Sequence, residues 1–188
     1  DSLHALARLA LLRSLERGVA PEKVIEATRL LDQASLELCE GQFMDVSFQE
    51  RVDISMSTYL RMIEGKTGAL MGCAMEMGAL MACDEPSVRR AFRQAGRQLG
   101  MAFQVRDDML DLWGRGVGKV AAADILNNKK SLPVVFAFEQ ASIKEKRELG
   151  TLYLKRVLEP ADVPRVVDLL TSLGAREFCQ EQANHYSQ

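Results

Sequence analysis

The chain has 188 residues, of which 47% are hydrophobic and 27% are charged, and this composition is that of one folded domain, not of a disordered segment. The net charge of −2 gives no general attraction to nucleic acid. The longest apolar runs are far too short to span a bilayer, so we expect no membrane span. The four cysteines form no Cys-x-x-Cys pair, which favours free thiols in a reducing, cytoplasmic setting.

Apolar residues recur at helical spacing along nearly the whole chain. The first stripe ends near Gly18, and Pro21 opens a second helix whose pattern continues as far as Gly41. The remaining helices are expected at about 48–63, 67–83 (buried on all sides), 86 to 112 or 113, from about 131, at 143–157 and 160–173, and from 175 onwards. Strand signals are weak and no linker is visible. We therefore predict a single all-α domain over residues 1–188.

The stretch 103–111 carries the strongest chemical signal. Asp107 and Asp111 are four residues apart, so they share a helix face, while Asp108 lies at its flank. The amide of Gln104 lies one turn earlier on the same face. Carboxylates at this spacing repel one another unless a cation neutralises them, and oxygen ligands without His or Cys suit Mg²⁺. A solvated acidic face is the alternative for this stretch taken alone.

Two further clusters precede the acidic stretch. Between two predicted helices, Gly65–Gly68 encloses Lys66 and Thr67, which we place at a helix N-terminus that suits an anion. The alternative is a simple interhelical turn capped by Thr67. Asp45 lies near the C-terminal end of the second helix, where a negative charge is unfavourable. This position hints at a role for Asp45 beyond helix stability.

Lysines follow the acidic stretch. A glycine-rich loop at 114–119 ends with Lys119, and Asp124 is followed by Lys129 and Lys130. Phosphate binding beside a carboxylate-held metal requires ammonium groups in such positions. A lysine pair alone is usually a solvated loop. The acidic stretch, the glycine loop and the lysines together favour a site for a diphosphate and Mg²⁺.

Four sequence blocks resemble those of one enzyme family, in the expected order. They read GQFMD, YLRMIEGKTGALM, FQVRDDMLD and GVGKVAAADILNNKKSLPVV. They are similar to blocks of the trans-isoprenyl diphosphate synthases (the polyprenyl synthetase family), most closely those of the bacterial geranylgeranyl or farnesyl type. The resemblance implies an all-α bundle of the isoprenoid-synthase type that joins an allylic diphosphate to isopentenyl diphosphate with Mg²⁺. It also implies a homodimer.

The resemblance assigns roles residue by residue. Lys66 and Lys129 would hold the allylic diphosphate, and Lys119 would help close the loop over it. Thr67 and Gln104, with the Lys66 carbonyl, would face the allylic cation. The metal ligands would be Asp107, Asp108 and Asp111, and the cavity would be lined by Gln42, Asp45 and Phe103.

The chain departs from the family pattern in one respect. Members carry a first aspartate-rich motif and an arginine pair on helices before the point where this sequence begins. We therefore expect a C-terminal portion that lacks the N-terminal helices and is nearly inactive alone, either as a fragment or as half of a two-chain bundle. Two alternatives stay open. One is a non-catalytic or split subunit that completes or regulates a synthase, and the other is a class I terpene cyclase, although the second metal motif of cyclases is missing.

Overall fold

The computed structural model describes residues 2–114, 123–153, 155 and 158–188, and within them it contains helices and no strand. The predicted all-α class is thus confirmed. The elements are α1 (Ser2–Arg13), η1 (Leu15–Arg17), α2 (Pro21–Phe48), α3 (Met56–Ile63), η2 (Glu64–Gly68), α4 (Ala69–Ala82), α5 (Pro86–Trp113), α6 (Ala123–Leu126), α7 (Leu132–Gln140), α8 (Ile143–Tyr153), α9 (Val163–Ser172) and α10 (Ala175–Tyr186).

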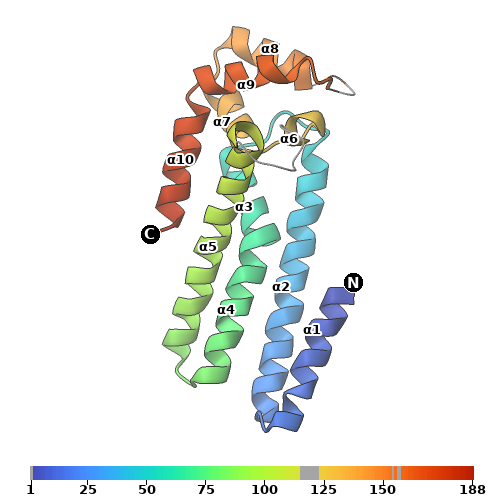
Figure 1. Ribbon diagram of the computed structural model, residues 1–188, viewed down its shortest axis with the longest axis vertical. Coiled ribbons are helices and arrows are strands. Elements are labelled where there is room, and N and C mark those ends of the chain that lie inside the picture. The colour runs from blue at the N-terminus through green and yellow to red at the C-terminus, as the bar shows by residue number, and fades with distance from the viewer. Residues whose placement is uncertain (1, 115–122, 154, 156–157) are drawn as a thin grey trace.

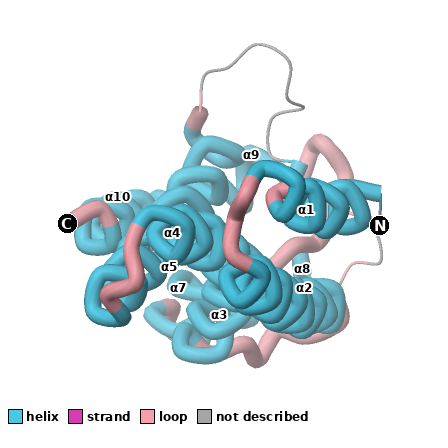
Figure 2. The backbone as a smooth tube through the Cα atoms, turned by 90° about the horizontal axis from the view of Figure 1, so that it is seen from below, coloured by secondary structure: helices cyan, strands magenta, loops and turns pink. Residues whose placement is uncertain are grey.

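Three long helices form the body of the molecule. The helix α4 packs against α2 on one side and α5 on the other (Figure 1). Viewed along the bundle from below, α1 lies at the α2 side and α10 at the opposite side, next to α5 (Figure 2). The short helices α7, α8 and α9 gather at one end of α5. The main apolar core lies at that end, between α3, α5, α7 and α10.

Several helix boundaries differ from the predicted ones. Because α2 continues to Phe48 and an irregular segment follows, the predicted third helix begins at Met56 and not near residue 48. Ser55 sets this start, since its hydroxyl accepts a hydrogen bond from the Thr58 N–H at 3.2 Å. Later in the chain, α8 ends at Tyr153, α9 begins at Val163, and the short α6 was not predicted. Capping contacts and long-range packing, not periodicity, decide these ends.

The predicted break at residues 64–68 is a π-helical turn. In η2 the Ala69 N–H bonds to the Glu64 carbonyl, five residues earlier, so α3 continues into α4 without a free helix start. The placement of Lys66 at a helix N-terminus was therefore wrong. The expectation that the following helix is buried on all sides was also wrong, because Leu70 is 42% exposed. Only the faces of α4 toward α2 and α5 are covered.

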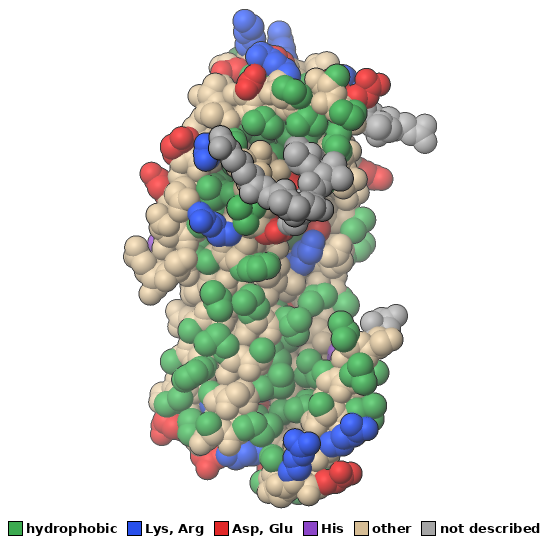
Figure 3. All heavy atoms as spheres, in the orientation of Figure 1, with side chains coloured by type: hydrophobic (Ala, Val, Ile, Leu, Met, Phe, Trp, Pro, Cys, Tyr) green, Lys and Arg blue, Asp and Glu red, His purple; other side chains and the backbone are tan. Residues whose placement is uncertain are grey.

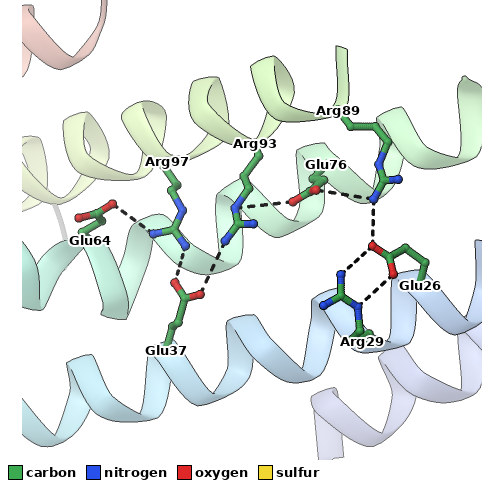
Figure 4. Close-up of polar contacts among 8 residues, drawn as sticks. All are labelled: Glu26, Arg29, Glu37, Glu64, Glu76, Arg89, Arg93 and Arg97. Carbon is green, nitrogen blue, oxygen red and sulfur yellow. Dashed lines mark hydrogen bonds and ion pairs between the residues drawn. The ribbon is translucent and has the colours of Figure 1, made fainter. Parts of the chain in front are cut away.

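Ion pairs cross between the long helices on the N-terminal half of α5 (Figure 4). Three arginines spaced four residues apart share one face of α5 and reach glutamates on its neighbours. We call this set the arginine ladder; it comprises Arg89, Arg93 and Arg97 with Glu26, Glu37, Glu64 and Glu76, and Arg29 as a further partner of Glu26. It joins α2, η2, α4 and α5.

Apolar side chains are also widespread on the surface, as Figure 3 shows for one face. On α5 they follow a helical stripe, and on α1 nearly every leucine is exposed. The exposed members on these helices include Leu3, Leu6, Leu9, Leu12, Val88, Phe92, Leu99, Phe103 and Leu110. Among the helices that the structure describes, none is both long and apolar enough to cross a membrane.

Candidate functional site

The C-terminal end of α5 carries the acidic stretch. The structure places Asp107 and Asp111 in partly exposed positions and buries Asp108 completely. Arg106 points away from this face, since its guanidinium donates to the Gln180 side chain on α10 at 2.8 Å. The two aspartates that share a helix face are therefore reachable from solvent, whereas the third belongs to the interior.

Asp108 accepts hydrogen bonds from three parts of the chain. Its Oδ2 receives the Tyr59 hydroxyl of α3 and the Leu132 N–H at the start of α7, the latter at 2.8 Å. Its Oδ1 receives the Gln104 amide at 3.0 Å, and the Lys129 Nζ lies 3.7 Å from the same oxygen. Burial raises the pKa of Asp108, and Lys129 acts most strongly in the opposite direction. We call these five residues the Asp108 cluster.

Lys129 joins this cluster to the segment that carries α6. Its ammonium contacts the Asp124 carboxylate at 2.8 Å. Burial acts to lower the pKa of Lys129, but the nearby carboxylates, Asp108 first, hold it well above its usual range. The segment is also tied to α5 directly, because the Asp124 N–H donates to Asp111 Oδ2 at 2.9 Å. Lys129 is thus a charged ammonium at neutral pH.

Lys130, the next residue, is buried and points the other way. Its Nζ lies 3.2 Å from the Gln49 carbonyl and 2.9 Å from the Asn128 carbonyl, and 5.0 Å from the centre of the Tyr153 ring. Asn128 has a φ of 55°, a left-handed conformation that asparagine tolerates well. This turn directs the two neighbouring lysines to opposite sides. Only Lys129 belongs to the acidic site.

The π turn contributes two further side chains to the site, Lys66 and Thr67. The Lys66 ammonium contacts Asp45 of α2 at 2.5 Å, and the Thr67 hydroxyl donates to Gln104 Oε1 at 2.9 Å. These contacts require α2 to approach the turn closely. Gly41 makes that possible, because a Cβ there would lie 2.3 Å from the Lys66 backbone nitrogen. π turns inside α-helices are frequent at functional sites.

The sequence-predicted residues are thus largely brought together. A continuous polar chain runs from Thr67 through Gln104 and Asp108 to Lys129, with Asp111 tied to the same segment. Gln42 and Phe103 are exposed on α2 and α5. Lys119 lies outside the described residues.

Sequence analysis missed two members of the site. Tyr59 donates to Asp108, and Asp124, noted only as a carboxylate between lysines, holds Lys129. A signal for Tyr59 existed, since a tyrosine within an apolar helix face needs a buried partner for its hydroxyl. The partner itself lies 49 residues away in sequence and could not be read from the pattern.

No group of three or more His, Cys, Asp or Glu side chains within the described part of the chain is arranged to hold a metal ion by itself. Magnesium commonly takes only one or two carboxylates and completes its shell with water and substrate phosphate oxygens. Asp107 and Asp111, partly exposed and one turn apart beside Lys129, fit such a shared site. The arrangement suits a diphosphate that brings its own oxygen ligands.

Comparison with known proteins places these residues in context. A model of the family described as polyprenyl synthetase matches residues 2–170. The geranylgeranyl pyrophosphate synthase of Geoglobus acetivorans is 38% identical over 187 residues, which are 99% of this chain and 56% of that protein. A (2E,6E)-farnesyl diphosphate synthase of Mycobacterium bovis is 34% identical over 165 residues, 85% of this chain and 46% of that protein. The chain spans about half the length of the curated relatives it matches.

Solved structures agree with the fold. The polyprenyl synthetase from Streptomyces coelicolor A3(2) superimposes with a TM-score of 0.86 at 32% identity, covering 99% of this chain and 56% of that one. The geranylgeranyl pyrophosphate synthetase from Pyrococcus horikoshii Ot3 gives a TM-score of 0.82 at 34% identity, covering 89% of this chain and 51% of that one. The predicted isoprenoid-synthase type of helical bundle is confirmed.

Proposed function

The chain belongs to the polyprenyl synthetase family, and on this premise we propose that it is part of a Mg²⁺-dependent trans-prenyltransferase that joins an allylic diphosphate to isopentenyl diphosphate. One observation carries the proposal. Partly exposed carboxylates, a permanently charged lysine and a pair of side-chain oxygens converge at the C-terminal end of α5. These are the three kinds of group that the reaction needs.

The reaction breaks the C–O bond of the allylic diphosphate, and pyrophosphate leaves with the electron pair. The double bond of isopentenyl diphosphate then attacks the allylic cation and forms a C–C bond. Loss of one proton, taken up by the departing pyrophosphate, gives the elongated allylic diphosphate. No side chain has to act as a base, so the enzyme contributes chiefly by charge stabilisation and exclusion of water.

The leaving group is held by cations. We assign Lys129 and Lys66 to the diphosphate oxygens, because each ammonium is already oriented by a carboxylate, Asp124 or Asp45. Asp107 and Asp111 would hold Mg²⁺ together with those oxygens. When bound, Mg²⁺ acts as a Lewis acid that neutralises charge on the leaving pyrophosphate. Lys119 is proposed as a further diphosphate ligand.

The positive charge that forms on the allylic carbon needs oxygen dipoles. Gln104 donates its amide hydrogens to Asp108, which turns its carbonyl oxygen toward the Thr67 hydroxyl. We assign these two oxygens, with the Lys66 carbonyl, to face the cation. Gln42, Asp45 and Phe103 are proposed to line the same cavity. Because the oxygens are fixed before the reaction, they need no reorganisation when the charge develops.

The test is a prenyl-transfer assay on the protein in its natural full length, with radiolabelled isopentenyl diphosphate, several allylic diphosphates, and Mg²⁺ or chelator. We expect Mg²⁺-dependent elongation, and a kcat about 10²–10³-fold lower in Asp107→Asn. Asp84→Asn is the matched control, because this 89%-exposed aspartate pairs with Lys23 near the opposite end of α5. A cyclic hydrocarbon formed from the allylic substrate alone would indicate a cyclase instead. Absence of any product would favour a non-catalytic subunit.

We also propose that the protein self-associates through α1 and α2. The exposed leucines of α1 and the side chains of α2 border an apolar groove of about 780 Å³, whose walls include Leu12, Leu15, Val24, Ile25 and Leu36. Burying such a face against a second copy is favourable. Light scattering after size-exclusion chromatography should give a dimer for the wild type and a monomer for Leu12→Glu. A dimer that persists in Leu12→Glu would contradict this interface.

A further inference from the structure

Asp108 is closed to a metal ion by its burial, three hydrogen bonds and a facing ammonium group. An ionised carboxylate offers about four lone-pair sites on its two oxygens. Two donors, the Tyr59 hydroxyl and the Leu132 N–H, bond to Oδ2, and the Gln104 amide bonds to Oδ1. The Lys129 ammonium faces Oδ1 as an ion pair at 3.7 Å. The residue is 0% exposed. Magnesium dehydrates reluctantly and keeps several waters, which this closed position does not accommodate.

The three donors and the Lys129 ammonium come from four separate places in the fold. They lie in the middle of α3, on α5 itself, at the first turn of α7 and at the loop before α7. The Leu132 N–H is one of the helix-start amides that have no partner within α7, and a carboxylate is favoured there. Asp108 therefore fixes the position of three chain segments relative to α5.

Two of these groups around Asp108 themselves face the substrates in the proposed reaction. Lys129 is the ammonium assigned to the leaving pyrophosphate, and Gln104 carries the oxygen that Thr67 contacts. The same Asp108 oxygen, Oδ1, accepts the Gln104 amide and attracts the Lys129 ammonium, which Asp124 holds by a hydrogen bond. One buried oxygen atom therefore contacts both the side chain that faces the allylic cation and the ammonium that faces the diphosphate.

We propose that Asp108 is a positioning residue and not a metal ligand: it orients Lys129 and Gln104 from a single buried carboxylate, while Asp107 and Asp111 alone approach the metal. This inference rests on the proposed function for the roles of Lys129 and Gln104. It gives Asp108 a different role from Asp107 and Asp111, although the sequence pattern assigns all three to the metal.

The test measures binding of Mn²⁺ and inorganic pyrophosphate to the protein in its natural full length, without turnover. Paramagnetic resonance of free Mn²⁺ at saturating pyrophosphate reports the metal affinity. Calorimetry with pyrophosphate at saturating Mn²⁺ reports the anion affinity. A metal ligand changes the first quantity, and a residue that acts through Lys129 changes the second.

We expect Asp107→Asn to raise the Mn²⁺ concentration for half-saturation by about tenfold or more. Asp108→Asn should leave that concentration unchanged and weaken pyrophosphate binding by about tenfold, because it removes the buried negative charge that faces Lys129 at 3.7 Å. Lys129→Gln should weaken pyrophosphate binding similarly, and the double variant should be no weaker than Lys129→Gln. A metal half-saturation that moves in Asp108→Asn as far as in Asp107→Asn would overturn the proposal.

A second readout needs no ligand. The side-chain ammonium of Lys129, partly buried and hydrogen-bonded to Asp124, should give an observable signal in ¹⁵N-lysine NMR spectra. Asp108→Asn should shift or abolish this signal, and Asp107→Asn should leave it in place. Tyr59→Phe removes one donor to Asp108 but no charge, and it should also shift the Lys129 signal. It is the milder variant to use where Asp108→Asn does not fold. A signal unmoved in both variants overturns the positioning role. Failure of the wild type to bind Mn²⁺ and pyrophosphate would instead overturn the proposed function.

Discussion

Two charged networks join α5 to its neighbours, one along its N-terminal half and one at its C-terminal end. The arginine ladder pairs four arginines with four glutamates, so its charges balance (Figure 4). At the other end, carboxylates outnumber ammonium groups among the described residues. The members there are Asp45, Asp107, Asp108, Asp111 and Asp124 against Lys66 and Lys129.

This difference separates a structural network from one that can receive a ligand. In the ladder each charge has its counterion within the chain, so little is gained by adding another ion. At the C-terminal end the partly exposed Asp107 and Asp111 can share an external cation, and the oriented Lys129 and Lys66 favour an anion. A metal diphosphate supplies both. The two networks also differ in titration, because arginines stay charged whereas lysines respond to their surroundings.

The ladder should dominate stability and leave chemistry untouched. Glu76 is 8% exposed and lies between Arg89 and Arg93, at 3.8 and 3.6 Å. Glu76→Gln leaves these arginines without their shared counterion, and we expect a loss of about 3 kcal/mol in the free energy of unfolding. Urea unfolding measures this loss, and the kcat per folded molecule should stay at the wild-type value.

Surface ion pairs contribute only about 0–1 kcal/mol. A loss of that size in Glu76→Gln would place the ladder among them and remove the contrast in stability. Arg29→Gln is the matched control, because its guanidinium is 64% exposed at the edge of the ladder. We expect it to change the unfolding free energy little.

The sequence predicts those parts of the networks that depend on residues close together in the chain. The helical spacing of Asp107 and Asp111 is visible in the sequence, and so is the family resemblance that gave the fold. The burial of Asp108 is not, because periodicity says that it lies about 100° from Asp107 but not which side faces the interior. Asp108 faces the interior because it contacts Tyr59 and Leu132, which lie 49 and 24 residues away in the sequence.

The same reasoning explains the π turn. Glycines at 65 and 68 predict a break by local rules, and a break is what we expected. The structure keeps the helix continuous because packing against α2 and α5 on both sides favours a wider turn over an interruption. Tertiary contacts decided this segment, and a single sequence does not display them.

The contrast in titration can be measured at Lys129 and Lys130. Burial lowers the pKa of Lys130 to about 8, whereas carboxylates hold the pKa of Lys129 above its ordinary value. Between about pH 8 and the ordinary lysine pKa of about 10.4, the unfolded chain therefore binds more protons at residue 130 than the folded chain. The contribution of residue 130 to the unfolding free energy should rise with pH in this window, by at most about 1.4 kcal/mol per pH unit. The buried thiols of Cys73 and Cys179, whose pKa values burial raises, contribute a fall over the same window.

The contribution of Lys129 has the opposite sign. It is fully present below about pH 10.4 and is lost as pH rises further toward the folded-state pKa. The difference in unfolding free energy between the wild type and Lys130→Met, measured from about pH 7.5 to 10, should thus rise with pH, because the other titrating groups are common to both chains. The arginine ladder adds nothing to this slope, since its guanidiniums stay charged. A difference that stays flat with pH would show that the surrounding carbonyl oxygens keep Lys130 charged.

Two glycines allow a close approach between helices, one beside each network. A Cβ at Gly41 would lie 2.3 Å from the Lys66 backbone nitrogen, and a Cβ at Gly96 would lie 2.6 Å from the Met71 carbonyl oxygen. Either overlap forces helices apart, so we expect Gly41→Ala and Gly96→Ala each to lower the unfolding free energy by about 1–3 kcal/mol. The two variants are matched in chemistry and differ only in which network they disturb.

Their effects on the reaction should differ. Gly41→Ala displaces the π turn that carries Lys66 and Thr67, so it should raise KM for the allylic diphosphate and lower kcat by about tenfold, since misplacement of about 1 Å is costly in a preorganised site. Gly96→Ala separates α4 from α5 beside the arginine ladder and should leave both constants unchanged. Equal losses of activity would mean that the two ends of α5 are mechanically coupled. The ladder would then contribute to catalysis through the spacing of α4 and α5.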